Sequence, residues 1–179
     1  IGFEAARQLA GDQAEILMVC RSKERGEKAA AQILSEYPDA VLSLHIADLS
    51  SPASINKLVA ELESSYDSLS MLINNAGGIF YSRMETEDGL EYTFGLNHMG
   101  YFRLTKGLLP LLKEAKNARI INVSSEAHRY STINFDDLQS DKAYRAFRVY
   151  GKSKLAKILF TKELAKRIQG TEISTASLH

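Results

Sequence analysis

Short apolar runs alternate along the chain with longer segments in which apolar residues recur every three or four positions. The apolar runs predict five strands, at 16–20, 41–47, 71–75, 119–124 and 173–178. The periodic segments predict helices from Phe3 to Ala10 and at 24–36, 52–65, 86–115 and 144–168. Strands that are aliphatic on both faces and alternate with helices form a parallel sheet. The pattern therefore predicts an α/β fold, a doubly wound parallel sheet in a single domain.

Prolines and polar residues refine the predicted helices. Pro52, directly after Ser51, indicates a helix start, and Pro110 should bend or end the long helix near Leu109. In the last helix we expect an apolar stripe to face the core, made of Leu155, Ile158, Leu159, Leu164 and Ile168. We expect the opposite, basic face to be solvated, with Lys157, Lys162, Lys166 and Arg167.

Charge and cysteine content narrow the classes of function. The chain has 179 residues and a net charge of zero, with acidic and basic residues interspersed. This argues against a nucleic-acid surface and against a polybasic membrane patch. The single cysteine, Cys20, has no partner for an internal disulfide, which favours a reducing compartment and a small buried residue at a strand end. No run of about 18 apolar residues is present, so we expect no membrane segment in these residues.

Polar and basic residues follow four of the predicted strands. In doubly wound sheets the ligand binds beyond the carboxyl ends of the strands. The residues at these positions are Arg21 and Ser22 after the first strand, Asp48 and Leu49 after the second, Asn75, Ala76 and Gly77 after the third, and Ser124 and Ser125 after the fourth. The sequence therefore predicts a ligand site along this edge of the sheet.

Tyr150 and Lys154 stand four residues apart in a predicted helix, so their side chains share one face. A lysine charge close to a phenol favours the ionised form, which would make Tyr150 a proton donor or acceptor near neutrality. Such a pair is also common as a solvated pair on a helix surface. The upstream polar residues at the strand ends, together with Asn97, favour a catalytic pair.

The chain resembles the short-chain dehydrogenase/reductases along nearly its whole length, most closely the retinol-dehydrogenase-like and carbonyl-reducing members. The stretches that carry this resemblance are 95–102, 119–125 with 127–128, and 150–155 with 159–161. The resemblance implies a Rossmann-like, NAD(P)-binding domain over residues 1–179. It also implies an interior piece of a longer protein, because only the end of the family's glycine-rich turn remains, as Ile1-Gly2. The family's first strand would precede Ile1, and its last strand and substrate-binding segment would follow His179.

The resemblance implies a catalytic tetrad. Tyr150 would be the acid for carbonyl reduction, or the base for alcohol oxidation. Lys154 would assist Tyr150 and bind the nicotinamide ribose, and Ser125 would hydrogen-bond the substrate oxygen. Asn97 would hold a water that connects Lys154 to solvent. The alternatives are that Ser124 and Ser125 only cap the next segment and that Asn97 only bends a helix and satisfies backbone groups; the family places catalysis on the second serine.

The cofactor can be predicted from the end of the first strand. Members that select NAD usually carry an acid there, whereas this chain has Arg21, whose guanidinium can hold a 2′-phosphate. NADP(H) is therefore favoured over NAD(H), unless Arg21 is only a solvated loop cation. The resemblance assigns further cofactor contacts to Gly2, Asp48, Leu49, Asn75, Ala76, Gly77, Tyr150 and Lys154. It requires no metal, and we expect none at His98 or His128.

These residues predict an NADP(H)-dependent oxidoreductase that transfers a hydride between the nicotinamide and a carbonyl or alcohol of a lipophilic small molecule, such as a retinoid, steroid or xenobiotic. One alternative is a catalytically idle nucleotide-binding scaffold or sensor of the same fold, and another is a nucleotide-sugar epimerase. Relatives often dimerise through helices that match 86–115 and 144–168, which implies a homodimer that the loop before Tyr150 could obstruct. We expect a cytoplasmic or cytosol-facing location, which is compatible with a membrane anchor outside these residues.

Overall fold

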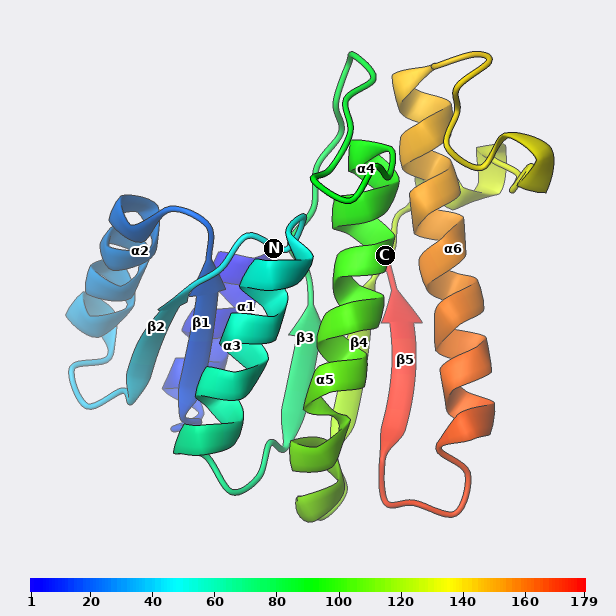
Figure 1. Cartoon of the computed structure of the whole chain (residues 1–179). Coiled ribbons are helices and arrows are strands. Elements are labelled where there is room, and N and C mark those ends of the chain that lie inside the picture. Colours follow the sequence, from blue (N-terminus) through cyan, green and yellow to red (C-terminus); the bar gives the residue numbers. More distant parts are fainter. The chain divides into compact units, whose positions relative to one another are not determined.

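The first of two compact units runs from Ile1 to Asp48 in a computed structural model that describes all of residues 1–179. It contains α1 (Gly2–Gly11), β1 (Ile16–Cys20), α2 (Lys23–Glu36) and β2 (Leu42–Ile46). The two strands are parallel, with Ile16 opposite Leu42 (Figure 1). Ala10, Met18 and Ile33 form the buried core of this unit, and the small side chains Ala29 and Ala30 pack α2 against it.

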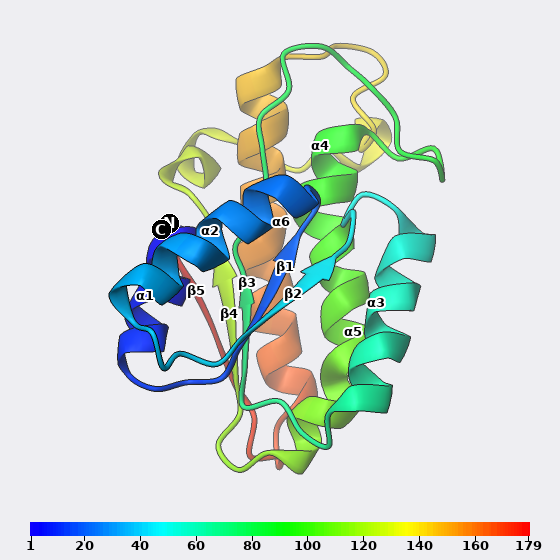
Figure 2. The same cartoon turned by 90° about the vertical axis from the view of Figure 1, so that its left-hand side faces the viewer.

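The second unit runs from Leu49 to His179 and contains a three-stranded parallel sheet in the order β3–β4–β5. Its helices α3, α5 and α6 lie on the same face of this sheet (Figures 1 and 2). The elements are α3 (Pro52–Ser65), β3 (Met71–Asn74), α4 (Tyr92–Phe94), the π-helical turn η1 (Gly95–Met99), α5 (Gly100–Glu114), β4 (Arg119–Val123), the 3₁₀ turns η2 (Glu126–Tyr130) and η3 (Phe135–Asp137), α6 (Ala146–Arg167) and β5 (Ser174–Leu178). No helix is both long enough and apolar enough to span a bilayer.

Hydrophobic periodicity located all five strands to within a residue at each end. The start of α3 is also confirmed, because Ser51 is its N-cap and accepts a hydrogen bond from the amide of Ser54, 3.2 Å away, while Pro52 occupies the first turn. Cys20 lies at the end of β1 as predicted, but it is only partly buried. Burial raises the pKa of its thiol, which keeps the thiol protonated.

The predicted helix over 86–115 is wrong in its first turn. The amide of Thr86 donates to the carbonyl of Leu90, and Gly89 has φ of +77°, so this segment is a turn. The helix begins at Tyr92 because both carboxylate oxygens of Glu91 accept hydrogen bonds from amides of the first helical turn, each 2.8 Å away. Pro110 does not end the helix, since α5 continues to Glu114.

A line of buried polar side chains connects the sheet of the second unit to the helices that cover it. Asn74 Nδ2 donates to Thr105 Oγ1 on α5 at 3.0 Å and to Asn122 Oδ1 on β4 at 2.9 Å. Asn122 Nδ2 donates in turn to Thr161 Oγ1 on α6, 3.0 Å away. These bonds give the buried Nδ2 groups acceptors and fix α5 and α6 relative to the strand ends, next to the candidate site.

Candidate active site

Tyr150 and Lys154 lie one turn apart near the start of α6. The Lys154 ammonium is 5.3 Å from the centre of the Tyr150 ring, and its side chain is buried. Lys154 Nζ donates to the carbonyl of Val123, the last residue of β4, over 3.1 Å. An ammonium has three N–H donors, so this bond leaves donors that a ligand can use.

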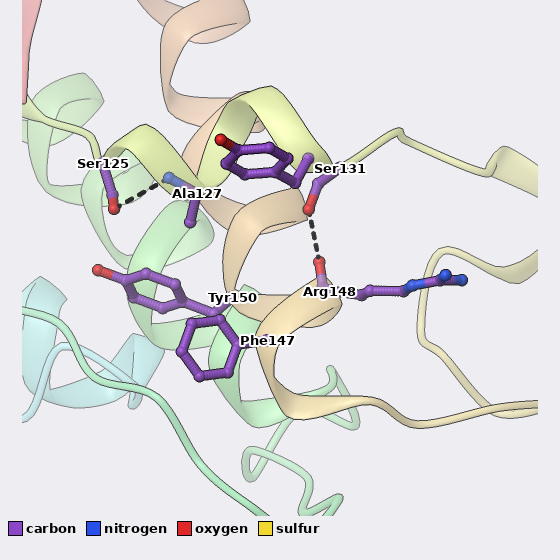
Figure 3. Close-up of a pocket in the computed structure, with 7 residues that line it drawn as sticks. Ser125, Ala127, Ser131, Phe147, Arg148 and Tyr150 are labelled. Atoms are coloured by element: carbon purple, nitrogen blue, oxygen red, sulfur yellow. Dashed lines mark hydrogen bonds between the residues drawn. The ribbon is translucent and has the colours of Figure 1, made fainter.

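Ser125 and Tyr150 line one pocket of about 540 Å³, with their hydroxyls on the same side of it (Figure 3). Ser125 directly precedes η2, and its Oγ accepts a hydrogen bond from the amide of Ala127, 3.3 Å away. The capping role considered for this serine is therefore real, and it coexists with a place in the pocket. Ser124 does not line the pocket, because its Oγ is buried and donates to the carbonyl of Lys154.

Asn97 lies in the π-helical turn between α4 and α5 and is fully buried. Its Oδ1 accepts from the amide of Gly78 at 3.0 Å, and its Nδ2 donates to the carbonyl of Gly78 and to Ser153 Oγ. Asn97 therefore holds the loop after β3, as the structural alternative for this residue proposes. The same bonds also attach it to α6, close to Tyr150 and Lys154.

Gly77 approaches Asn97 and Lys154 so closely that no side chain fits at its position. A Cβ placed on Gly77 would lie 2.7 Å from Asn97 Oδ1 and 3.9 Å from Lys154 Nζ. The loop that contains Asn75, Ala76 and Gly77 therefore reaches the same place as the Lys154 ammonium. The second unit thus brings together five of the predicted site positions: Gly77, Asn97, Ser125, Tyr150 and Lys154.

The other predicted cofactor contacts are distributed between the units. Gly2 is the first residue of α1, Arg21 is exposed directly after β1, and Asp48 follows β2 by two residues; all three belong to the first unit. Leu49 begins the second unit and is buried. The cofactor roles of Gly2, Arg21 and Asp48 stay predictions.

The sequence interpretation was wrong about the burial of Lys157, which lies close to the candidate site. We expected it to face solvent, but it is fully buried, and Leu159, expected in the core, is exposed. The reason is helical phase: Tyr150, Lys154 and Lys157 follow the spacing i, i+4, i+7 on the face of α6 that meets the end of β4. That spacing could have indicated that Lys157 shares a face with Tyr150 and Lys154, but a charged residue is normally expected in solvent.

The two histidines near the site have structural contacts. His98 packs against the rings of Phe94 and Phe160, and burial lowers its pKa to about 4. His128 Nδ1 lies 2.6 Å from the carbonyl oxygen of Ser125. No group of three or more His, Cys, Asp or Glu side chains is placed to hold a metal ion.

Two loops near the pocket are joined to each other. Arg83, in the loop after β3, forms an ion pair with Asp141 at 2.5 Å and donates to the carbonyl of Gln139. Both partners belong to the loop that precedes α6. The hydroxyl of Tyr144 donates to the carbonyl of Phe80, 2.7 Å away. We name this pair of loops, residues 78–91 and 131–145, the joined loops.

The sequence model of the family described as short chain dehydrogenase matches residues 1–179. The chain belongs to this family. Retinol dehydrogenase 12 of Mus musculus is 42% identical over 179 residues, which is all of this chain and 57% of the relative. Retinol dehydrogenase 13 of Homo sapiens is 41% identical over all of this chain and 54% of its own length. The chain thus spans a little over half the length of these relatives.

Solved structures confirm the Rossmann-like α/β fold. A crystal structure of a protein from Mycobacterium paratuberculosis has 33% identity and a TM-score of 0.86, over 98% of this chain and 63% of that one. The complex of Pseudomonas aeruginosa RhlG with NADP has 27% identity and a TM-score of 0.76, over 98% of this chain and 65% of that one. Membership of the family makes a nicotinamide cofactor the expected partner of this chain.

The residues of the second unit fit a nicotinamide nucleotide. Lys154 has hydrogen-bond donors left for ribose hydroxyls, and the backbone at Gly77 approaches it without a side chain in between. A hydroxyl from Tyr150 and one from Ser125 face the adjoining pocket. Together they supply a proton donor, a second hydrogen-bond donor and a fixed positive charge around one polar atom of a substrate.

Proposed function

We propose that the protein is an NADP(H)-dependent oxidoreductase that interconverts a carbonyl and an alcohol on a lipophilic small molecule. The observation that carries this proposal is the pocket shared by Ser125 and Tyr150, with Lys154 Nζ 5.3 Å from the Tyr150 ring. A non-catalytic scaffold of the same fold has no chemical need for this combination.

The proposed roles follow from the position of each group. Bound NADPH would supply a hydride to the carbonyl carbon of the substrate. Tyr150 then gives its phenolic proton to the carbonyl oxygen, and Ser125 hydrogen-bonds that oxygen as negative charge develops on it. The Lys154 ammonium stabilises the phenolate that remains on Tyr150 and holds the nicotinamide ribose. Asn97 fixes the loop at Gly78 and connects Lys154 to solvent through a water.

A lipophilic substrate is proposed because of the aromatic rings at the pocket. Tyr130 and Phe147 both line it, and their side chains are 84% and 71% exposed. Exposed aromatic rings at a pocket provide apolar area for a large carbon skeleton. The relatives named retinol dehydrogenase also support a lipophilic substrate.

The preference for NADP(H) rests on Arg21, which follows β1 and is exposed. A guanidinium suits a phosphate because it offers several donors in one plane. We assign the 2′-phosphate to Arg21, the adenine to Asp48 and Leu49, the pyrophosphate to Gly2, and the adjoining ribose to Asn75, Ala76 and Gly77. RhlG, which shares the fold, has been solved with NADP.

We further propose a homodimer through α5 and α6. Phe102 on α5 and Leu159 on α6 are 41% and 49% exposed, and Phe102 lies 5.8 Å from the ring of Phe160. These apolar side chains suit a helical contact between two copies. A monomer in size-exclusion chromatography with light scattering, at micromolar concentration, would contradict the proposed homodimer.

The reducing, cytosol-facing location that we propose rests only on the use of cysteine.

The decisive experiment replaces Tyr150 by Phe in the full-length protein. We expect NADPH binding to persist, while turnover of a retinal or steroid ketone falls by at least about a hundredfold, because general acid catalysis typically supplies 10²–10⁴ in rate. Tyr81→Phe is the matched control, since Tyr81 is 82% exposed. Turnover of the Tyr150 variant within threefold of wild type rules out the proposed acid. A wild-type protein that binds NADPH but reduces no carbonyl compound favours the scaffold alternative.

A further inference from the structure

Lys157 is a buried lysine to which the proposed reaction assigns no role. Its side chain has 0% exposure, and its Nζ donates to the carbonyl of Val123 at 3.0 Å. The same Nζ lies 4.0 Å from the centre of the Tyr101 ring. Lys154 donates to the same Val123 carbonyl at 3.1 Å, so two amines share one acceptor at the end of β4.

The charged and titratable groups around Lys157 do not include an acid. Lys154 lies on its own helix, Tyr101 faces it from α5, and His98 faces it from η1. The Tyr101 ring favours a cation, but burial and the Lys154 ammonium have the larger, opposite effect and hold the pKa of Lys157 well below its ordinary value. Two ammonium groups on one carbonyl would repel each other, which further favours the uncharged form of Lys157.

An uncharged amine at this position can act in two ways at once. One N–H donates to Val123, as the structure records, and the lone pair is able to accept a hydrogen bond from Lys154. The Lys154 ammonium is then held from two sides, by a carbonyl and by an amine. One N–H of Lys154 then remains for a ligand beside Tyr150, whose ring centre is 5.3 Å from Nζ.

We propose that Lys157 is a positioning residue that fixes the Lys154 ammonium beside Tyr150, through the Val123 carbonyl that both amines share. This inference rests on the proposed function, because it gives Lys157 a role in the same proton transfer. It also implies acid sensitivity. A proton added to Lys157 removes the acceptor for Lys154 and places a second positive charge beside it, so turnover falls as the pH is lowered.

The test compares Lys157→Gln with Lys157→Met in the full-length protein. Gln is uncharged and keeps both a donor for Val123 and an acceptor for Lys154, whereas Met fills a similar volume without hydrogen bonds. We expect kcat at pH 7.5 to stay within threefold of wild type for Gln and to fall about tenfold for Met, with the KM for NADPH changed less than kcat. We expect the acid decline of kcat in wild type to be absent in both variants.

Lys162→Met is the control, because Lys162 is exposed on the same helix. It should leave kcat and the pH profile unchanged. Kinetic values are normalised to the folded fraction found by circular dichroism, so that a variant that only loses stability is recognised. Equal loss of kcat in the Gln and Met variants, or an acid decline that persists in Gln, overturns the inference.

A measurement independent of turnover separates this inference from the proposed function. Lys157 is protonated in the unfolded chain and uncharged in the folded one, so folding releases a proton and the folded state gains stability as the pH rises. The thermal midpoint of wild type should therefore rise more steeply between pH 6 and 9 than that of Lys157→Gln. Equal slopes refute the uncharged amine even if the Tyr150 prediction succeeds. If the slopes of wild type and Lys157→Gln differ but wild type shows no turnover, the result supports the uncharged Lys157 and rejects the proposed enzymatic function.

Discussion

Asn97 Nδ2 donates a hydrogen bond to Ser153 Oγ, 3.0 Å away, although the two residues are 56 positions apart in the chain. Ser153 Oγ donates in turn to the carbonyl of Tyr150 at 2.7 Å. The serine is fully buried and lies between the residue proposed for the water relay and the backbone of the proposed acid. It therefore sets the position of the π-helical turn relative to the start of α6.

Ser153→Ala should lower both stability and turnover. The variant leaves one N–H of Asn97 buried without an acceptor, which costs about 1–3 kcal/mol. We expect the free energy of unfolding in urea to fall by that amount and kcat to fall several-fold, while Ser64→Ala, on an exposed position of α3, changes neither. An unchanged free energy of unfolding would show that Asn97 finds another acceptor.

Arg21→Asp should shift the cofactor preference toward NADH. The substitution removes a charge-assisted hydrogen bond of about 1.5–3 kcal/mol and adds repulsion toward the 2′-phosphate. The ratio of kcat/KM for NADPH to that for NADH should fall roughly ten- to a hundredfold. Lys28→Asp, on an exposed position of α2, serves as the control for charge alone. A ratio that does not change identifies Arg21 as a loop cation without a cofactor role.

Gly77→Ala should damage the site more than it damages the fold. The new Cβ would lie 2.7 Å from Asn97 Oδ1, so the loop or the amide must move, at a cost of about 1–3 kcal/mol. Turnover should fall at least tenfold. Gly170→Ala is the comparison. At Gly170 φ is +81°, so a side chain there is strained, but it would contact nothing within 4 Å. If both variants lose stability equally and neither loses turnover per folded molecule, Gly77 has no part in the site.

His98 should make the protein less stable in acid. Burial lowers its pKa from 6.5 to about 4, so the unfolded chain binds a proton in this interval that the folded chain does not. The stability that His98 provides is complete above pH 6.5 and is lost as the pH falls toward 4, by up to about 1.4 kcal/mol for each pH unit. The free energy of unfolding of His98→Phe should vary less than that of wild type over this window. If His98→Phe retains the wild-type slope, the acid sensitivity has another source.

The regular elements were predictable because their determinants are local. Aliphatic runs located the strands, and Ser51 with Pro52 marked the start of α3. The turn before α4 was missed because its determinants, although local, do not affect apolar periodicity: the glycine at 89 with positive φ, a hydrogen bond between Thr86 and Leu90, and the cap provided by Glu91. Helical periodicity continues through such a turn without any visible break.

Candidate site residues could be predicted because polar groups follow the strands. The buried environment of Lys157 was not predicted. A lysine is expected in solvent, since burying an ammonium without an acid is costly. Here the end of β4 offers a carbonyl, Tyr101 offers a ring and Lys154 offers a shared hydrogen-bond site. Val123 and Tyr101 lie on segments that only the folded chain brings to α6, so the spacing of Lys157 from Tyr150 and Lys154 was its one local signal.

The joined loops have a consequence for the design of hybrid proteins. Arg83 and Tyr144 belong to different loops, and each donates at least one hydrogen bond to the other loop. A graft that imports only residues 131–145 from a relative would separate these partners and leave Arg83 facing foreign side chains. An exchange of these loops with a relative should therefore transfer both together as one unit.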